Sequence, residues 1–324
     1  MIKIMSGYPS QLRQSRFNQR WVLVAAGRAK RPHQFADSAS VADARDPFDP
    51  ATVKPEDIIT ARPDIGEWQA VAIPNAFPFL IAGDDPDLRG RIQDGYGFHE
   101  LVIHSRAADQ DFEQFEPTQT ARVLEIYAAR YRDLAARPHI KHVQIFTNRG
   151  HSAGASVRHP HSQIVALPVV PPHVAVLQQA ARQYHERTGR GVADDELVDE
   201  RDQAERIVMR TDHFLAYCPF ASHVDHQVRI IPLAGDTRFE TLESAERLDL
   251  AAVINETYRK LDTVDGIPPY NAFLRTTPVG EEGAFRWHFD IMPRRGTPGG
   301  LELATGLDVI TVPPETAAAS LREA

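Results

Sequence analysis

The chain has 324 residues, of which 25% are charged and 42% hydrophobic, and its formal net charge is −8. This is the composition of a globular protein long enough for two domains or one long double domain, and its acidic balance argues against a nucleic-acid binder. No apolar run is long enough to span a bilayer, and the first residues, MIKIM, become polar too soon for a signal peptide. The single cysteine excludes an intramolecular disulfide. We therefore expect a cytoplasmic protein without membrane or nucleic-acid partners.

The first part of the chain predicts strands separated by irregular segments. Residues 1–16 are interpreted as a loose arm, and the apolar run Trp21–Val24 as a strand. Residues 33–67 are rich in Pro, Asp and Ala, which is typical of an irregular surface segment. Further along we expect strands at 69–74 and 98–103 and a helix at 117–137, with Leu124, Tyr127, Tyr131 and Leu134 at helical spacing on its core face.

The segment 147–168, TNRGHSAGASVRHPHSQIVALP, carries the strongest chemical signal. It follows a strand-like run and opens with small residues at 150–156, which let backbone N–H groups approach an anion closely. A second strand then begins. Residues two apart in a strand share a face, so His159, His161 and Gln163 are predicted to point to the same side. Two imidazoles and an amide beside such a turn suggest attack by an imidazole nitrogen on phosphorus.

The same turn has a competing interpretation. Residues 150–154, GHSAG, match G-x-S-x-G, the nucleophile elbow of serine hydrolases. That motif needs a helix directly after the turn. Here the chain runs instead into His159 and Pro160, and the residue before a proline is biased away from helix. We therefore reject a hydrolase with Ser152 as nucleophile.

The second half of the chain repeats the order of elements in the first. It predicts helices at 172–187, from 194 onward and at 242–261, and strands at 207–209, 214–218, 227–232, 270–275 and 285–293. The order strand, helix, strand, strand occurs twice. We expect an α+β fold with an internal duplication, 1–190 and 191–324, each half an antiparallel sheet with helices packed against it. At the position that corresponds to His159-Pro160-His161, the second half has Arg286-Trp287-His288-Phe289-Asp290. We therefore expect one active centre, in the first half.

Five motifs, in order, carry a family resemblance. They are the strand run 17–24 followed by the basic RAKRP at 28–32, NAFP at 75–78, FHELVI at 98–103, the small-residue turn with HPHSQ at 150–163, and RWHFDI at 286–291. In this order they are far more specific than a single His-Pro-His. The chain resembles the galactose-1-phosphate uridylyltransferase family of the histidine-triad superfamily. Its segments SAGAS and ALPVVPP are similar to those of the ADP-glucose phosphorylase branch. The resemblance implies a duplicated histidine-triad-like fold and a homodimer.

The resemblance also implies roles for single residues. His161 would be the catalytic nucleophile, accompanied by His159 and Gln163. Glu302 would accept a hydrogen bond from a sugar hydroxyl, although on its own it is an exposed glutamate at a turn. The residues implied to bind the nucleotide and its phosphates are Arg28, Arg31, Asn75, Phe77, Asn148, Gly154, Ala155 and Ser156. From the residues alone, the two arginines form a solvated basic turn and Phe77 is a core residue.

One part of the family pattern is missing. The family's CPFCPG, whose cysteines ligate a structural zinc, reads DPFDP here, with Asp46 and Asp49 in place of the cysteines. A third ligand, a histidine, falls near Ala108, so only His159 remains of the four. Asp46, Asp49 and His159 can in principle hold a harder ion. We favour a metal-free turn rebuilt by hydrogen bonds, its geometry set by the two prolines, and expect no required cofactor.

The resulting hypothesis is a two-step nucleotidyl transfer. His161 attacks the α-phosphorus of a nucleoside-diphosphate sugar, sugar 1-phosphate leaves, and a hexose 1-phosphate then takes the nucleotidyl group from the histidine. A backbone carbonyl, by resemblance that of His159, would fix the tautomer. Two alternatives remain: phosphorolysis of ADP-glucose or a dinucleoside polyphosphate by the same histidine, which Ser162 and the SAGAS turn favour, and a nucleotide-binding protein without catalysis, which the missing zinc ligands favour.

Overall fold

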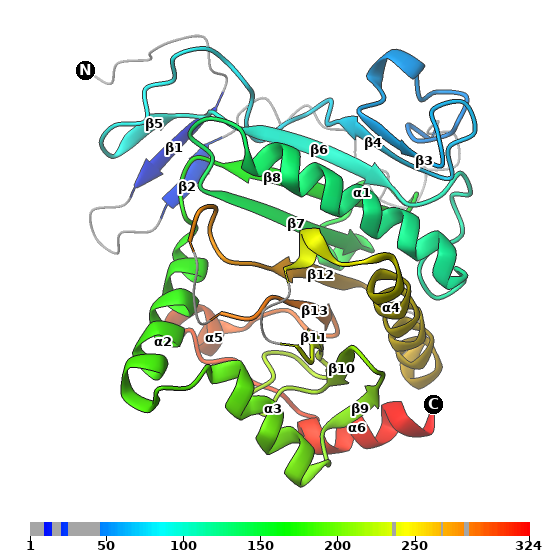
Figure 1. Cartoon of the computed structure of the whole chain (residues 1–324), viewed down its shortest axis with the longest axis vertical. Coiled ribbons are helices and arrows are strands. Elements are labelled where there is room, and N and C mark those ends of the chain that lie inside the picture. The colour runs from blue at the N-terminus through cyan, green and yellow to red at the C-terminus, as the bar shows by residue number, and fades with distance from the viewer. Residues whose placement is uncertain (1–9, 15–20, 25–45, 235–237, 267, 282–284) are drawn as a thin grey trace.

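The computed structural model describes residues 10–14, 21–24, 46–234, 238–266, 268–281 and 285–324 (Figure 1). Its centre is a ten-stranded sheet in which all neighbouring strands are antiparallel. In spatial order the strands are β3 (Thr60–Arg62), β4 (Ala70–Pro74), β6 (Phe98–Ile103), β8 (His161–Leu167), β7 (His142–Arg149), β12 (Tyr270–Arg275), β13 (His288–Pro293), β11 (Val228–Pro232), β10 (Phe214–Tyr217) and β9 (Ile207–Arg210).

The strand order is symmetric about its middle. The first half of the chain supplies β3-β4-β6-β8-β7, the second half supplies β9-β10-β11-β13-β12, and the two series meet where β7 pairs with β12. The long helices occupy equivalent places, α1 (Pro117–Ala135) between β6 and β7 and α4 (Ser244–Asp265) between β11 and β12. This is the arrangement that the repeated order of elements predicts. A boundary near residue 190 would fall between α2 (Pro172–Thr188) and α3 (Val192–Gln203) and stays a prediction.

Helices α1 and α4 cover one face of the sheet together with α6 (Pro314–Glu323) (Figure 1). Pro117 suits the first turn of α1, and Glu243 and Glu246 form a capping box that starts α4. The apolar stripe of each helix packs on the sheet, as Leu124 and Leu250 do in the same core cluster as Ile164 and Ile291. The helical periodicity in the sequence is therefore confirmed.

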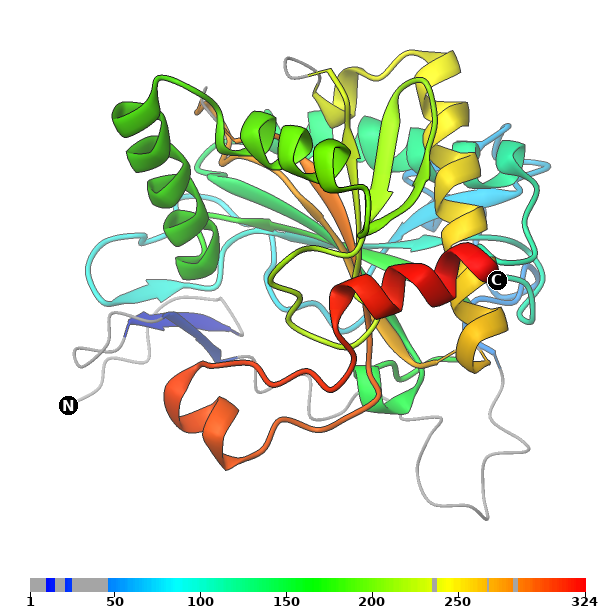
Figure 2. The same cartoon turned by 90° about the horizontal axis from the view of Figure 1, so that it is seen from below.

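The opposite face of the sheet is covered by smaller elements. Over the first half, Phe48 and Trp68 pack on Leu101 and Ile103, held by a segment that contains η3 (Pro55–Asp57). Over the second half, α3 packs on β10 and β11, and Figure 2 shows α2 and α4 on opposite sides of the sheet. His161 pairs with Ile103 across β6 and β8, so the predicted catalytic side chains belong to this second face.

A small second sheet lies beside the first. It consists of β2 (Trp21–Val24), β1 (Gln11–Gln14) and β5 (Ile92–Asp94) in that order. The prediction of a loose arm over residues 1–16 is therefore wrong for 11–14, where pairing on both edges and burial of Leu12 fix the chain. One apolar residue in QLRQ is too weak a period-2 signal to reveal this strand. Across the described residues, we find no helix with the length and apolar character needed to cross a membrane.

Candidate active site

The turn between β7 and β8 depends on two glycines. Gly150 has φ +79° and a Cβ there would lie 2.8 Å from Pro269; Gly154 has φ +85° and ends the single turn η4 (His151–Ala153). Only glycine adopts such backbone angles at little cost. The exposed Ser152 lies within η4, and the described chain runs from there to β8 without an α-helix, so the nucleophile-elbow geometry is absent.

Two N–H groups of this turn bond within it. The N–H of Gly154 donates to the carbonyl of His151 at 2.9 Å, and the N–H of Ala155 donates to the carbonyl of Gly150 at 3.2 Å. These bonds hold the turn, and a contact of Gly154 or Ala155 with a phosphate stays a prediction. Ser156, which is 3% exposed, remains a candidate donor.

His161 is held in one tautomer. Its Nδ1 lies 2.8 Å from the carbonyl oxygen of His159, and a carbonyl can only accept, so Nδ1 carries a proton and the neutral imidazole has its lone pair on Nε2. The side chain is 6% exposed, and the ring of Phe48 contacts it edge-on at a centroid distance of 5.0 Å. The family resemblance predicted that the carbonyl of His159 would fix the tautomer of His161. The result is an imidazole prepared to act as a nucleophile through Nε2.

His159 bridges two parts of the chain. Its Nδ1 lies 2.7 Å from a carboxylate oxygen of Asp46 and its Nε2 lies 2.9 Å from the carbonyl oxygen of Ser105. Both partners can accept, so both ring nitrogens are placed to donate a hydrogen bond. The bridge fixes the residue whose carbonyl orients His161.

The side chains at the family's zinc position do not gather around one point. Asp46 accepts the N–H of Phe48 at 2.9 Å as well as the His159 bond, whereas Asp49 accepts the N–H of Ala51 at 2.7 Å and is exposed. Within the described residues no three His, Cys, Asp or Glu side chains are grouped as metal ligands. The residues present therefore do not fit the zinc of the family pattern.

Gln163 is oriented by His99. The backbone N–H of Phe79 donates to Nδ1 of His99 at 3.0 Å, so the other nitrogen, Nε2, carries the proton and donates to Oε1 of Gln163 at 2.9 Å. The Phe79 ring stacks on His99 at 4.6 Å. With its oxygen engaged, Gln163 presents its NH2 group to a ligand. Sequence reasoning assigned no role to His99, although it stands in the FHELVI strand next to β8.

Asn75 and Phe77 lie at the end of β4, next to His99. The Asn75 side-chain oxygen accepts the N–H of Phe77 at 2.8 Å, and its amide nitrogen lies 3.0 Å from Nε2 of His99. The half-buried Phe77 is thus held by a tight turn. The structure therefore places Asn75 in the same polar group as His99 and Gln163.

Asn148 is held by the second half of the chain. Asn271, its cross-strand partner on β12, donates to the Asn148 oxygen at 2.7 Å and to the carbonyl of Ala153 at 2.9 Å. The Arg294 side chain in turn donates to the Asn271 oxygen at 2.5 Å. The Asn148 amide NH2 remains available beside the turn. Neither Asn271 nor Arg294 was predicted, because the pairing of β7 with β12 joins residues far apart in the sequence.

Comparison with known proteins connects this geometry to a family. The family model of the N-terminal domain of galactose-1-phosphate uridyl transferase matches residues 2–171, more than half of the chain. The chain belongs to the galactose-1-phosphate uridylyltransferase family. The protein is therefore an enzyme of the nucleotidyltransferase type.

Individual members of the family are similar over almost the whole chain. ADP-glucose phosphorylase of Arabidopsis thaliana is 28% identical over 97% of this chain and 92% of its own length. Galactose-1-phosphate uridylyltransferase of Thermotoga maritima is 27% identical over 97% and 98%. The crystal structure of the Arabidopsis phosphorylase with bound ADP-glucose matches with a TM-score of 0.78 at 28% identity, covering 97% of this chain and 98% of that one. The α+β fold is thus that of the uridylyltransferase family.

Behind the catalytic strand lies a buried network that sequence reasoning missed. The Ser162 hydroxyl faces the helix side, where it contacts Nε2 of His104 at 2.7 Å, the Thr147 hydroxyl at 2.5 Å and the Tyr127 hydroxyl. His104 continues to Asp111 at 3.1 Å. Burial raises the pKa of Asp111, but His104 and Arg149 outweigh it and bring that pKa below its ordinary value. Ser162 therefore anchors β8 to α1 and lies on the opposite face from His161.

Three predicted residues remain, Arg28, Arg31 and Glu302. Arg28 and Arg31 fall outside the described residues. Glu302 lies on α5 (Gly300–Thr305), where its carboxylate accepts the N–H of Gly299 at 2.9 Å and so caps the start of its own helix. This bond supports the structural interpretation of Glu302, and contact with a sugar stays a prediction.

Proposed function

We propose that the protein transfers a nucleoside monophosphate between a nucleoside-diphosphate sugar and a hexose 1-phosphate through a nucleotidyl-histidine. The lone pair of His161 Nε2 forms a bond to the α-phosphorus while the bond from that phosphorus to the bridging oxygen breaks, and sugar 1-phosphate leaves. A phosphate oxygen of the acceptor then attacks the same phosphorus and restores the free imidazole. The observation that carries the proposal is the His161 Nδ1 bond to the His159 carbonyl, since in the neutral imidazole it puts the lone pair on Nε2.

Neighbouring groups would stabilise the charge on the phosphate oxygens. The NH2 groups of Gln163 and Asn148 have their amide oxygens already engaged, so both are prepositioned donors. Such fixed donors stabilise a transition state without reorganisation. Ser156 would add a donor, Arg28 and Arg31 would bind the phosphates, and Asn75 with Phe77 would contact the nucleoside.

Phosphorolysis of ADP-glucose by the same histidine is the second candidate. The similarity to the Arabidopsis ADP-glucose phosphorylase over nearly the whole chain favours it. The two reactions share the first half and differ in the base and in the acceptor, which is inorganic phosphate in phosphorolysis. For either reaction we propose a cytoplasmic homodimer.

Intact-protein mass measurement after incubation with one donor at a time tests this function. With UDP-glucose or UDP-galactose, a gain of one uridylyl group is expected, and non-acidic conditions must be kept because a phosphorus–nitrogen bond to histidine is acid-labile. An adenylyl gain from ADP-glucose would instead establish the second candidate. No adduct with any of the three donors would contradict both reactions.

We also propose that the Asp46–His159 bridge works without a metal. Replacing Asp46 with alanine is expected to destabilise the protein by about 1–3 kcal/mol, because it leaves a buried donor of His159 unsatisfied, and to slow nucleotidyl transfer. Asp49→Ala is the matched control and should cost about 0.5 kcal/mol or less, since Asp49 is exposed and bonds only within its turn. Thermal and urea unfolding measure both. Chelator dialysis of the wild type should change neither stability nor rate; a loss restored by Zn²⁺ would contradict the metal-free bridge.

A further inference from the structure

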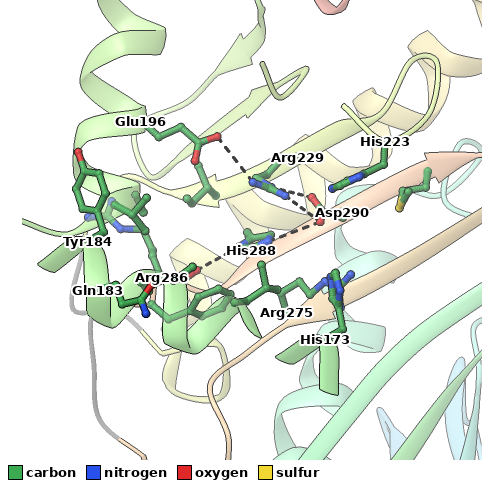
Figure 3. Close-up of a pocket in the computed structure, with 18 of the residues that line it drawn as sticks. His173, Gln183, Tyr184, Glu196, His223, Arg229, Arg275, Arg286, His288 and Asp290 are labelled. Atoms are coloured by element: carbon green, nitrogen blue, oxygen red, sulfur yellow. Dashed lines mark hydrogen bonds and ion pairs between the residues drawn. The ribbon is translucent and has the colours of Figure 1, made fainter. Parts of the chain in front are cut away.

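The second half of the chain repeats the local geometry of the catalytic strand. On β13, Nδ1 of His288 lies 3.2 Å from the carbonyl of Arg286, as Nδ1 of His161 does with His159 two residues earlier. Asp290 then takes the place of Gln163, and its cross-strand partner on β11 is Arg229. A cavity of about 750 Å³ opens on this face, between β11, β12, β13 and the helices α2 and α3 (Figure 3). The duplication has thus produced a second pocket with different chemistry.

Most charged groups of this pocket neutralise one another. Arg229 binds both carboxylate oxygens of Asp290, at 2.8 and 3.2 Å, and Nε2 of His288 lies 3.6 Å from the same carboxylate. Arg286 contacts Asp194 and two backbone carbonyls. At Nε2 of His288, the neighbouring Asp290 carboxylate disfavours an anion and cannot donate as Gln163 does. The pocket is therefore not a second nucleotidyl-transfer centre.

Arg275 differs from these paired groups. It lines the cavity half-buried, and with the residues that the structure describes its guanidinium makes no hydrogen bond or ion pair; its contact is the Phe273 ring, 4.2 Å away. Burial lowers the pKa of Arg275 and Arg229 lowers it further, against the opposing effect of Asp290. A partly desolvated charge without a counter-ion is unfavourable unless a ligand supplies the opposite charge.

Two histidines line the cavity as well. His173, at the start of α2, and His223 both line it (Figure 3). Partial desolvation lowers the pKa of His173, the charges of Arg275 and His223 lower it further, and Asp290 opposes them. Figure 3 shows the side chains of His173 and Arg275 beside each other. Asp308 holds His223 through a 2.6 Å contact with Nδ1. The guanidinium and the His173 imidazole together offer donors suited to a phosphate group.

We propose that this C-terminal cavity binds a small phosphate dianion, as inorganic phosphate or as a phosphate monoester, with Arg275 as its main contact and His173 as a second donor. The cavity is large enough to hold the sugar of a sugar phosphate as well. The site lies on the second half of the sheet and is distinct from the strand β8 that carries His161.

Calorimetric titration of three proteins tests the site. Wild type, Arg275→Gln and Arg182→Gln are each titrated with inorganic phosphate and, separately, with glucose 1-phosphate. Arg182 is the matched control, because it is an exposed arginine of α2 paired with Glu281 and outside the cavity lining. All three proteins keep the residues around His161, so binding of the ligand there is the same in each. The test therefore compares the binding constants of Arg275→Gln and Arg182→Gln. Loss of a charge-assisted hydrogen bond should weaken binding about 10- to 100-fold in Arg275→Gln alone.

The outcomes distinguish inorganic phosphate from a phosphate ester, and ligand binding from a purely structural role of Arg275. A loss confined to phosphate identifies the inorganic ion, and one confined to glucose 1-phosphate identifies the ester. Equal binding by the two variants would overturn the proposal. Without anion, Arg275→Gln should unfold at the same or a higher temperature than wild type, because it removes an unpaired charge; a fall would indicate a structural arginine and also overturn it. Arg275→Lys, which keeps the charge, should retain most of the binding.

Discussion

Replacing His161 with alanine is expected to abolish nucleotidyl transfer, lowering the rate by on the order of 10⁴-fold or more. On β8, the bond from Nδ1 of His161 to the His159 carbonyl puts the lone pair of the neutral imidazole on Nε2. The side chains of His161 and Gln163 lie on the same face of this strand. Without it the reaction loses its covalent intermediate, so neither half-reaction proceeds. Steady-state rates and the mass of the donor-treated protein measure this directly. The variant should show no adduct at any donor concentration.

His288→Ala provides the matched comparison for that experiment. His288 is the duplicate of His161 on β13 and has the same carbonyl contact, but a carboxylate stands beside its Nε2. We expect this variant to form the adduct. An adduct that survives in His161→Ala and disappears in His288→Ala would move the chemistry to the second half of the chain. Persistence of the adduct in both variants would rule out either histidine as the nucleophile.

The sequence predicted the secondary structure correctly where the helix or strand was long enough to show a local pattern. Strand 98–103 and the start of the helix at Pro117 agree with the structure, because strand-forming apolar residues and a proline at the first helical position act within a few residues. The missed elements are short. β1, β5 and α5 contain three to six residues each, and β1 is a strand because two neighbouring strands pair with it.

The site was predictable where it depended on residue spacing. The two-residue period places His161 and Gln163 on one face, and Phe48 contacts both His159 and His161. The partners that orient these groups were not predictable. His99 is 64 residues from Gln163, and Asn271 is 123 residues from Asn148. Which nitrogen of a histidine carries the proton depends on such tertiary partners, and a single sequence does not contain them.

The orientation of Gln163 makes a second strong prediction. Gln163→Ala is expected to lower kcat about 100-fold with a small change in KM, because it removes one prepositioned donor to the phosphate oxygens. Ser162→Ala is the comparison: its hydroxyl faces α1, so that variant should lose about 1–3 kcal/mol of stability from the buried network with a much smaller loss of kcat. Rate measurements at saturating substrate, corrected for the folded fraction, separate the two effects. If both variants lost kcat equally, the loss would reflect displacement of the whole strand, and the Gln163 amide would have no direct contact with the transferring phosphate.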